Sequence, residues 1–252
     1  SNAMKMPVSN RWKAWIIVML TPLLLGGCSA LRLSYGQGPL LAYWWLDRQV
    51  DFTTEQAPRV REALADWFAW HRSTQLPDYA QGLGEVAAAA AGPFTPQQVC
   101  AQIDAWQQRA ERAFDRAVPA VAEQLRSLTP AQLQRLEQHQ AERQQELAAE
   151  RLQADPAERQ KAALDRAIDR AETLYGSLDS AQRQLLAAGL AASPSDPERW
   201  LAERRARNAE LLRSLRQWQA ERADTATVQA GLRRLAADTA RSPRADYRAY
   251  SQ

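Results

Sequence analysis

The chain has 252 residues, of which 46% are hydrophobic and 24% are charged. This is the composition of an ordinary globular protein, and it excludes a disordered or collagen-like chain. The 32 Lys and Arg exceed the 29 Asp and Glu by three, and Lys5, Arg11 and Lys13 supply that excess within an acid-free stretch, residues 1–27. Because the remaining chain is electrically balanced, we expect no nucleic-acid partner.

The N-terminal residues have the pattern of an export signal. Residues 1–3 are the scar of an expression tag that precedes Met4. A basic segment is followed by an apolar run that ends at Leu25, and we assign a signal peptide to residues 4–27. The uncharged 18-residue run 14–31 could instead span a bilayer, although its glycine pair and its proline make it a poor spanning helix.

A cysteine follows the apolar run at the position of a lipidation site. The segment Leu25-Gly26-Gly27-Cys28 resembles the bacterial lipobox, which has small residues before a cysteine whose thiol receives a diacylglycerol. The resemblance implies cleavage before Cys28, attachment to a membrane through this residue, and a tether over residues 28–38. Ser29 matches the pattern that directs enteric lipoproteins to the outer membrane, where they face the periplasm. The alternative is an ordinary signal peptide, which would leave Cys28 unmodified.

Cysteine and histidine are too few for a disulfide framework or a metal-binding motif. Besides Cys28 the only cysteine is Cys100, which we expect to be a buried small hydrophobic residue or, alternatively, half of a bridge to another chain. The two histidines, His71 and His139, lie far apart in the sequence, and His139 falls in a polar segment where we expect it to be solvated. We therefore expect no metal and no cofactor.

The body of the chain is predicted to be all-α. Only nine residues after Cys28 are Val or Ile, too few for a sizeable sheet, whereas the helix-forming residues Ala, Leu, Gln, Glu and Arg dominate. Because the connections are short, we predict one elongated antiparallel multi-helix bundle over residues 39–252. Ser242-Pro243 has the form of one more helix start, which leaves open whether the chain continues beyond Gln252. The predicted helices span residues 39–50, 54–73, 76–91, 95–127, 130–153, 156–175, 179–192, 197–222 and 225–241.

Five of these helix starts carry residues that cap a helix N-terminus. A Thr or Asp side chain accepts the free N–H of the third helical residue, and a Gln or Glu at that position reaches back. Proline suits the first helical position because its missing N–H has no partner there. The segments are Thr53-Thr54-Glu55-Gln56, Thr95-Pro96-Gln97-Gln98, Thr129-Pro130-Ala131-Gln132, Asp155-Pro156-Ala157-Glu158 and Asp179-Ser180-Ala181-Gln182.

The spacing of apolar residues predicts which helix faces are packed. From Val99 to Val121 they recur at steps of four and three, so we expect this face to lie in the core. Pro119 lies within the same helix and is expected to kink it. Residues 137–146 are polar on all sides, which predicts an exposed helix that protrudes from the bundle and is stabilised by charge pairs.

One helix start also matches a chaperone signature. Leu128-Thr129-Pro130-Ala131-Gln132 resembles the LTxxQ motif of periplasmic chaperones of the Spy/CpxP type, and residues 94–98 are a near match. The resemblance implies a helical protein that cradles unfolded clients. The same five residues also make an ordinary helix start, with a hydrophobic contact, an N-cap, a proline in the first turn and a capping glutamine. Any helical protein can use such a start.

A second resemblance covers most of the chain. The segments that carry it are Leu31-Arg32-Leu33 with Tyr35, Tyr43-Trp44-Trp45-Leu46-Asp47, Val50-Asp51, Ala69-Trp70-His71-Arg72, Leu76-Pro77 with Tyr79, Leu190-Ala191-Ala192-Ser193-Pro194, and Asp196-Pro197-Glu198 with Trp200-Leu201. Through them the chain is similar to a family of proteobacterial helical lipoproteins of unknown function. The resemblance implies an envelope lipoprotein with an all-helical fold, and it supplies no catalytic or binding residue.

The strongest candidate for chemistry is a group of acidic and aromatic residues. Asp47 and Asp51 are four residues apart, which places both carboxylates on one face of a helix. Trp44 and Trp45 beside them could withdraw these carboxylates from water. His71 could then complete an acid/base set.

Each of these residues also has a structural interpretation. The carboxylates would pair with arginines, the tryptophans would be core residues, and His71 would be hydrogen-bonded at the edge of the core. The aromatic segment 39–46 would form a buried first helix or, because it follows Cys28 by only about a dozen residues, could rest on the membrane, where aromatic residues favour the interface. The arginines in question are Arg48, Arg59 and Arg72.

Taken together, these features favour binding over catalysis. We expect a lipid-anchored helical protein of the periplasm, without enzymatic activity, that binds a protein partner or an unfolded client through an exposed apolar face. The alternative is a hydrolase that uses Asp47, Asp51 and His71. An open apolar concave surface would favour the first hypothesis, and a closed pocket in which the three side chains converge would favour the second.

Overall fold

The computed structural model confirms the all-α fold. It describes residues 35–251 except 90, 94 and 195, and within these residues it contains helices and no strand. The signal peptide and Cys28 lie outside the described residues. The helices are α2 (Gly38–Val50), α3 (Gln56–Trp70), the π-helix η1 (His71–Gln75), α4 (Leu76–Ala89), α5 (Pro96–Arg126), α6 (Pro130–Arg151), α7 (Pro156–Tyr175), α8 (Ser180–Ala192), α9 (Pro197–Ala220), α10 (Thr225–Ala240) and α11 (Ala245–Ser251).

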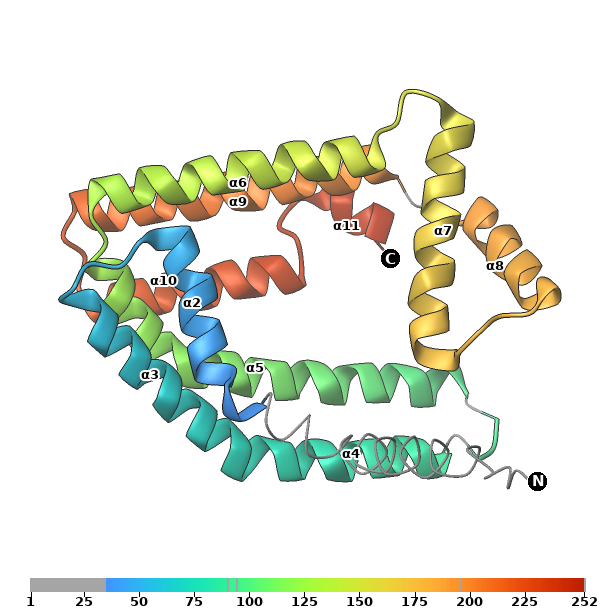
Figure 1. Ribbon diagram of the computed structural model, residues 1–252, viewed down its shortest axis with the longest axis horizontal. Coiled ribbons are helices and arrows are strands. Elements are labelled where there is room, and N and C mark those ends of the chain that lie inside the picture. Colours follow the sequence, from blue (N-terminus) through green and yellow to red (C-terminus); the bar gives the residue numbers. More distant parts are fainter. Residues whose placement is uncertain (1–34, 90, 94, 195, 252) are drawn as a thin grey trace, which may run out of the picture.

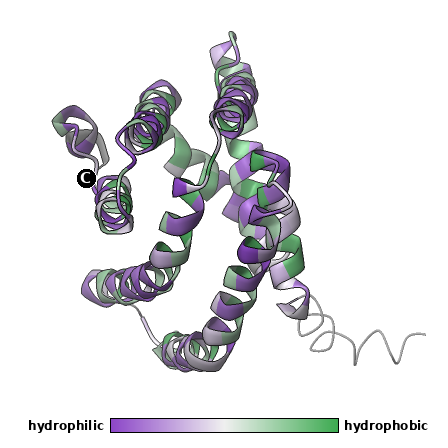
Figure 2. Ribbon diagram, turned by 90° about the vertical axis from the view of Figure 1, so that its left-hand side faces the viewer, coloured by the Kyte–Doolittle hydropathy of each residue, from purple (hydrophilic) through white to green (hydrophobic). Residues whose placement is uncertain are grey.

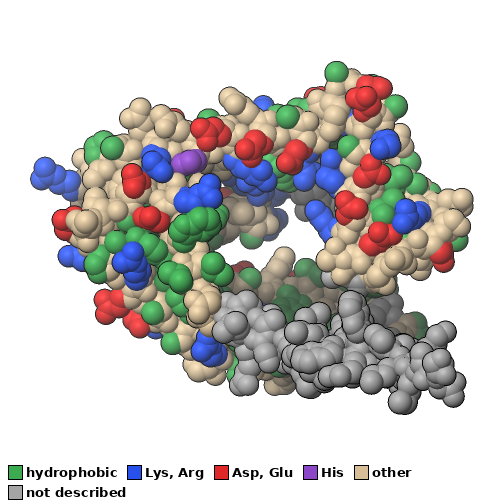
Figure 3. Space-filling model, viewed as in Figure 1, with side chains coloured by type: hydrophobic (Ala, Val, Ile, Leu, Met, Phe, Trp, Pro, Cys, Tyr) green, Lys and Arg blue, Asp and Glu red, His purple; other side chains and the backbone are tan. Residues whose placement is uncertain are grey.

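The helices pack as antiparallel neighbours around a central opening. In the pair of α5 and α10, Arg126 donates to Thr225 at one end, while Arg233 donates to Asp115 further along. Figure 1 shows α6 and α9 along one side, α4 and α5 along the opposite side, and α7 with α8 across one end. The space-filling view in Figure 3 shows the opening between these sides. The helices therefore surround an opening, and we call this open arrangement of helices the frame.

Four of the five predicted capping pairs are present, and the exception is Asp155, which accepts from the Ala157 N–H and not from the Glu158 N–H. The Thr129 side chain accepts a hydrogen bond from the Gln132 backbone N–H at 3.2 Å, and the Gln132 side chain accepts one from the Thr129 N–H at 2.9 Å. Each bond satisfies an N–H that the first turn of a helix leaves without a partner, so these helices begin at or beside the predicted residue. The same reciprocal arrangement is formed by Thr95 with Gln98 and by Asp179 with Gln182.

Two capping glutamines interlock in the interior. The buried Gln132 donates from Nε2 to Gln56 Oε1 at 2.7 Å and to the Asp51 carbonyl at 2.8 Å. Gln56 in turn donates to the Ser127 carbonyl at 2.7 Å. These bonds attach the start of α6 to the connection between α2 and α3. The glutamine of the LTxxQ-like segment therefore has a structural role in this chain.

Two clusters of buried apolar residues lie at one end of the frame, and Leu147 of α6 and Leu201 of α9 are buried apart from them. Trp218 of α9 packs against two clusters of buried residues there, one from α5 and α10 and one from the α5–α6 connection, α6 and α9. By contrast, no side chain of α7 or α8 is buried among those that the structure describes. Figure 2 shows that the helices visible in that view carry both hydrophobic and hydrophilic residues. The buried residues are Val118, Ala122, Val228 and Leu232 in the first cluster and Leu128, Leu133 and Leu215 in the second.

The prediction of a fully packed α5 is wrong for its N-terminal half. Val99 and Ile103 are exposed, and the buried residues near the other end are Val118 and Ala122. The reason is length, because α5 has 31 residues and its antiparallel neighbour α10 has 16, so α10 covers only the C-terminal half. The helix continues through Pro119, and Figure 1 shows it changing direction toward its C-terminal end.

Two further packing predictions are wrong. Cys100 lies in the exposed half of α5 and is itself exposed, so it is no buried hydrophobic residue. Its bridge to another chain stays a prediction. Residues 137–146 do not protrude, because they run along α9, where Glu137 forms an ion pair with Arg216. The charge pairs expected inside that segment are present as His139 with Glu142 and Arg143 with Glu146.

Candidate functional site

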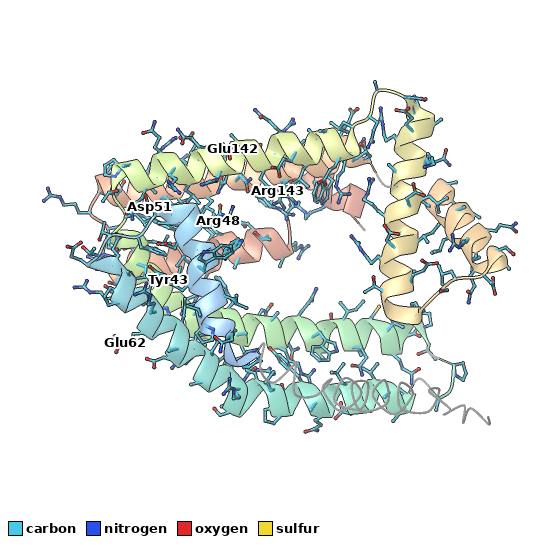
Figure 4. All side chains as sticks on the ribbon, viewed as in Figure 1. Tyr43, Arg48, Asp51, Glu62, Glu142 and Arg143 are labelled. Atoms are coloured by element: carbon cyan, nitrogen blue, oxygen red, sulfur yellow. The ribbon has the colours of Figure 1, made fainter. Side chains whose placement is uncertain are left out.

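The two candidate carboxylates lie at the C-terminal end of α2, where Figure 4 labels Asp51. Asp47 Oδ1 accepts a hydrogen bond from the Phe52 backbone N–H at 3.1 Å, and it accepts a longer one from the Tyr43 hydroxyl at 3.4 Å. Asp51 has a left-handed backbone with φ 61°, and its N–H donates to the Asp47 carbonyl at 2.7 Å. Its exposed carboxylate lies 3.7 Å from Arg135, an arginine that the sequence did not indicate as its partner. Both aspartates therefore stabilise the end of α2.

The tryptophans of α2 are exposed, which contradicts two of the three interpretations of them from the sequence and leaves the third, contact with a membrane, a prediction. Leu40, Leu41, Trp44 and Trp45 are each more than half exposed, and their spacing places them on one side of the helix. They neither shield the carboxylates nor belong to the core. The Arg48 guanidinium lies over the Trp44 ring at 5.2 Å from its centroid. The helix thus presents an apolar, aromatic face to solvent.

His71 lies in an aromatic cluster at the junction of α3, η1 and α4. Its Nδ1 is hydrogen-bonded to the Tyr35 hydroxyl at 2.7 Å, and its ring stacks on Trp67 with centroids 4.7 Å apart. Burial lowers the pKa of His71 below its ordinary value of 6.5, because the protonated ring would lose hydration. The hydrogen bond expected for His71 is therefore present, within an aromatic cluster that is separate from the two buried core clusters. Tyr35, which falls within the tether predicted over residues 28–38, takes part in this packing.

The structure does not bring His71 together with the aspartates. Helices α2 and α3 are antiparallel, since Gly38 abuts Phe68 while the Tyr43 ring lies under the Arg61 guanidinium, 4.1 Å from its centroid. His71 therefore follows the end of α3 that lies beside the start of α2. Asp47 and Asp51 follow Gly38, at the start of α2, by nine and thirteen residues. At a rise of 1.5 Å per residue they lie about 14–20 Å from that end of the helix. These side chains form no common acid/base site.

An apolar cavity of about 580 Å³, the α3–α5 groove, opens between α3 and α5. Val121 lines it and is 40% exposed, so solvent reaches the groove. Its charged lining residues have both signs and are exposed at the surface: Arg59, Glu62, Asp66 and Arg116. A concave apolar surface with few polar groups is typical of a binding site. The apolar walls include Leu46, Val50, Val60, Leu64, Trp67, Phe68, Val121 and Leu125.

The profile of one protein family matches residues 48–248, which is most of the chain. The chain belongs to DUF6279, a family of unknown function. Neither a search of curated proteins nor a search of solved structures finds a match.

Neither a membrane-spanning helix nor a metal-binding cluster occurs in the described part of this DUF6279 protein. Within residues 35–251, apart from the gaps given above, no helix is long and apolar enough to cross a membrane. In the same part of the chain, no three His, Cys, Asp or Glu side chains come together as a metal site requires. Both findings concern only what the structure describes.

The α3–α5 groove was not predicted, although its residues carry a helical pattern. In α3, Val60, Leu64 and Phe68 recur every four residues, which is a recognisable apolar face. The sequence indicates such a face but does not say whether a neighbouring helix covers it. In this DUF6279 protein, α5 stands beside that face without closing over it.

Proposed function

We propose that this DUF6279 protein is a lipid-anchored protein of the cell envelope whose helical domain binds an apolar helix of a protein partner. The α3–α5 groove is the observation that carries the binding role. Its walls are aliphatic and aromatic, and its charged residues are confined to exposed positions. An amphipathic helix would bury its apolar face in such a groove and place its charged residues against the exposed charges of both signs.

The anchor is supported by the pattern of the N-terminal residues. Their basic segment, apolar run and Leu25-Gly26-Gly27-Cys28 occur in the order of a lipoprotein signal. Each buried methylene of an acyl chain contributes about 0.8 kcal/mol, so two or three chains on Cys28 would hold the protein at a membrane.

The exposed face of α2 supports an orientation relative to that membrane. Tyr35 packs against His71 and follows Cys28 by seven residues, a span of at most about 25 Å when extended. The start of α2 would therefore lie near the bilayer. Trp44 and Trp45 would rest at the interface, where tryptophan is enriched, and Arg48 beside them would meet lipid headgroups.

Binding of unfolded clients, as in chaperones of the Spy/CpxP type, would be a second use of the same groove. The LTxxQ-like segment does not favour it, because Gln132 is already engaged in capping α6 and in the buried pair with Gln56. No observation among the described residues favours the hydrolase, because His71 lies apart from Asp47 and Asp51.

Two matched variants test the groove. Val121 and Val99 are exposed valines of the same helix, and only Val121 lines the groove. We expect Val121→Glu to abolish binding of a fluorescent, Leu-rich amphipathic peptide, measured by fluorescence anisotropy, and Val99→Glu to leave it unchanged. Equal effects of the two variants would contradict the proposal. Binding of a urea-unfolded model protein in place of the peptide would assign the groove to clients instead.

The anchor is tested separately. We expect Cys28→Ala to leave the domain folded, as judged by its melting temperature, and to release it from the membrane fraction. Mass spectrometry of the native protein should show a diacylated N-terminal cysteine. A Cys28→Ala protein that still sediments with membranes would argue for a peripheral or spanning attachment.

A further inference from the structure

The frame contains a second cavity whose lining is basic. It has a volume of about 870 Å³ and lies where the end of α6, α7, the end of α8 and the start of α9 meet. Four arginines line it, Arg151 from α6 and Arg159, Arg166 and Arg170 from α7, together with Trp200 of α9. None of the described residues that line it is Asp or Glu. Figure 3 shows Lys and Arg side chains facing the central opening beside α7.

These four arginines lack acidic partners. Arg159 donates to the Gln153 carbonyl at 2.8 and 3.1 Å, and Arg166 donates to the Glu150 carbonyl at 3.1 Å. Backbone carbonyls position a guanidinium but carry no net charge. Within the part of the chain that the structure describes, none of the four forms an ion pair. No carboxylate of the described residues is therefore in direct contact with the positive charge that gathers here.

Arg151 is the most constrained member of the group. Its Nε is buried and has no hydrogen-bond partner among the described residues. Its guanidinium lies over the Trp200 ring at 4.5 Å from the centroid. Burial lowers the pKa of Arg151, and the charges of Arg166 and Arg170 act in the same direction, against the opposing charge of Glu150. Like charges beside a partly buried guanidinium are costly in the free protein, and an anion in the cavity would reduce that repulsion.

In an adjacent cavity, arginines form ion pairs with carboxylates of the lining. It has a volume of about 830 Å³ and is also rich in arginine, but its lining includes Glu203, Glu210 and Asp238. Arg207 lies 3.0 Å from Glu203, and Arg234 lies 3.2 Å from Glu210. Two arginines of that cavity are thus paired with carboxylates of its lining, whereas the lining of the cavity beside α7 contains no carboxylate.

We propose that the cavity beside α7 binds a phosphate-bearing anion, gripped by Arg151, Arg166 and Arg170 beside the ring of Trp200. The planar guanidinium matches phosphate oxygens with two parallel hydrogen bonds, which makes arginine the preferred residue for such ligands. Four guanidinium groups without a carboxylate in direct contact suit a ligand with more than one negative charge. The volume falls within the range of small-ligand sites, roughly 300–1,000 Å³.

Two acids at neighbouring helix starts do not neutralise these arginines. Asp155 accepts the Ala157 N–H at 2.9 Å at the start of α7, and Asp196 accepts the Glu198 N–H at 2.9 Å at the start of α9. Both carboxylates are engaged in capping helices, and neither lines the cavity. The ligand would therefore compete with no carboxylate of the lining.

Isothermal titration of the full chain with inorganic pyrophosphate at low ionic strength tests the site. We expect saturable binding that Arg151→Gln and Arg170→Gln each weaken by about tenfold or more, as the loss of a charged hydrogen bond predicts. Arg222→Gln is the matched control, since Arg222 is an exposed arginine between α9 and α10, at the core end of the frame. Equal weakening by Arg222→Gln would show nonspecific attraction and overturn the proposal.

Vesicles distinguish a soluble phosphate compound from a lipid headgroup. Co-sedimentation of the full chain is compared on phosphatidylcholine vesicles with and without phosphatidylglycerol. Extra binding to phosphatidylglycerol that is lost in Arg151→Gln with Arg170→Gln, but kept in Arg222→Gln, would identify a headgroup as the source. Pyrophosphate binding without that extra binding would identify a soluble ligand, and absence of both would overturn the proposal.

The melting temperature of the ligand-free protein tests independently whether Arg170 is a structural residue. If the arginines serve a ligand, Arg170→Gln relieves repulsion and should leave the melting temperature unchanged or raise it. A lower melting temperature would show that Arg170 is a structural residue and would remove it from the proposed site.

Discussion

The two ends of the frame are held together by different interactions. At the core end, where α5, α6, α9 and α10 meet, Val118, Ala122 and Val228 are at most 1% exposed. At the hairpin end, formed by α7 and α8, no described side chain is buried, and a typical contact is the ion pair of Arg183 with Glu172 at 2.7 Å. Apolar burial is the main source of folding free energy, whereas exposed ion pairs contribute little. The core end therefore stabilises the domain, and the hairpin end is free to carry charge for binding.

Deletion of a large apolar side chain should show the greatest difference between the ends. Leu215 is buried in the core end, and Leu185 of α8 is 75% exposed. We expect Leu215→Ala to lower the free energy of unfolding by about 2–5 kcal/mol, through lost burial and a residual cavity. Leu185→Ala should change it by less than about 0.5 kcal/mol in the same urea titration. Similar losses would mean that α7 and α8 contribute to the core.

The two helices that begin with a Thr-Pro sequence, α5 and α6, place the same capping motif in an exposed and in a buried environment. Gln132 caps α6 and is buried in contact with Gln56, whereas Gln98 caps the exposed start of α5. Gln132→Ala should cost about 1–3 kcal/mol, because it leaves buried amide and carbonyl groups without partners. Gln98→Ala should cost at most about 0.5 kcal/mol, since water replaces the lost bond. Denaturant unfolding of both variants measures the difference, and equal costs would reduce Gln132 to a simple cap.

A glycine-to-alanine pair should give effects of opposite sign. A Cβ on Gly231 would lie 2.2 Å from Trp218, whose ring packs against both buried clusters, so Gly231→Ala should destabilise by about 1–3 kcal/mol. A Cβ on Gly189 in α8 meets no atom within 4 Å. Gly189→Ala should therefore stabilise by about 0.5–1 kcal/mol, through helix propensity alone. Thermal unfolding of the two proteins tests the signs.

The pH dependence of stability should depend on His71. Because burial lowers the pKa of His71 in the folded chain, the unfolded chain binds a proton first as the pH falls below about 6.5. Stability from this residue is complete above that pH and declines toward the lower folded pKa. We expect the melting temperature to fall less between pH 7.5 and 5.0 in His71→Phe than in the unmodified protein. Equal falls in the two proteins would contradict the prediction.

The candidate site shows where inference from spacing stops. The interval of four residues correctly places Asp47 and Asp51 near one another at the end of α2. It cannot show that α3 returns antiparallel and carries His71 to the opposite end of α2. Arg159, Arg166 and Arg170 likewise recur at seven and four residues, a single helix face, but the acids between them make α7 look balanced in sequence. Only the tertiary structure, which brings Arg151 of α6 close to the arginines of α7, shows that they form a basic group.

The sequence by itself determined the all-α class and most helix starts, because a cap such as Thr129 with Gln132 acts within one turn of the chain. Tertiary structure alone decided which apolar faces are covered. Val99 and Val118 belong to the same helix, and they differ because α10 reaches one of them and ends before the other. Burial depends on elements a hundred or so residues away, and no local pattern contains that information.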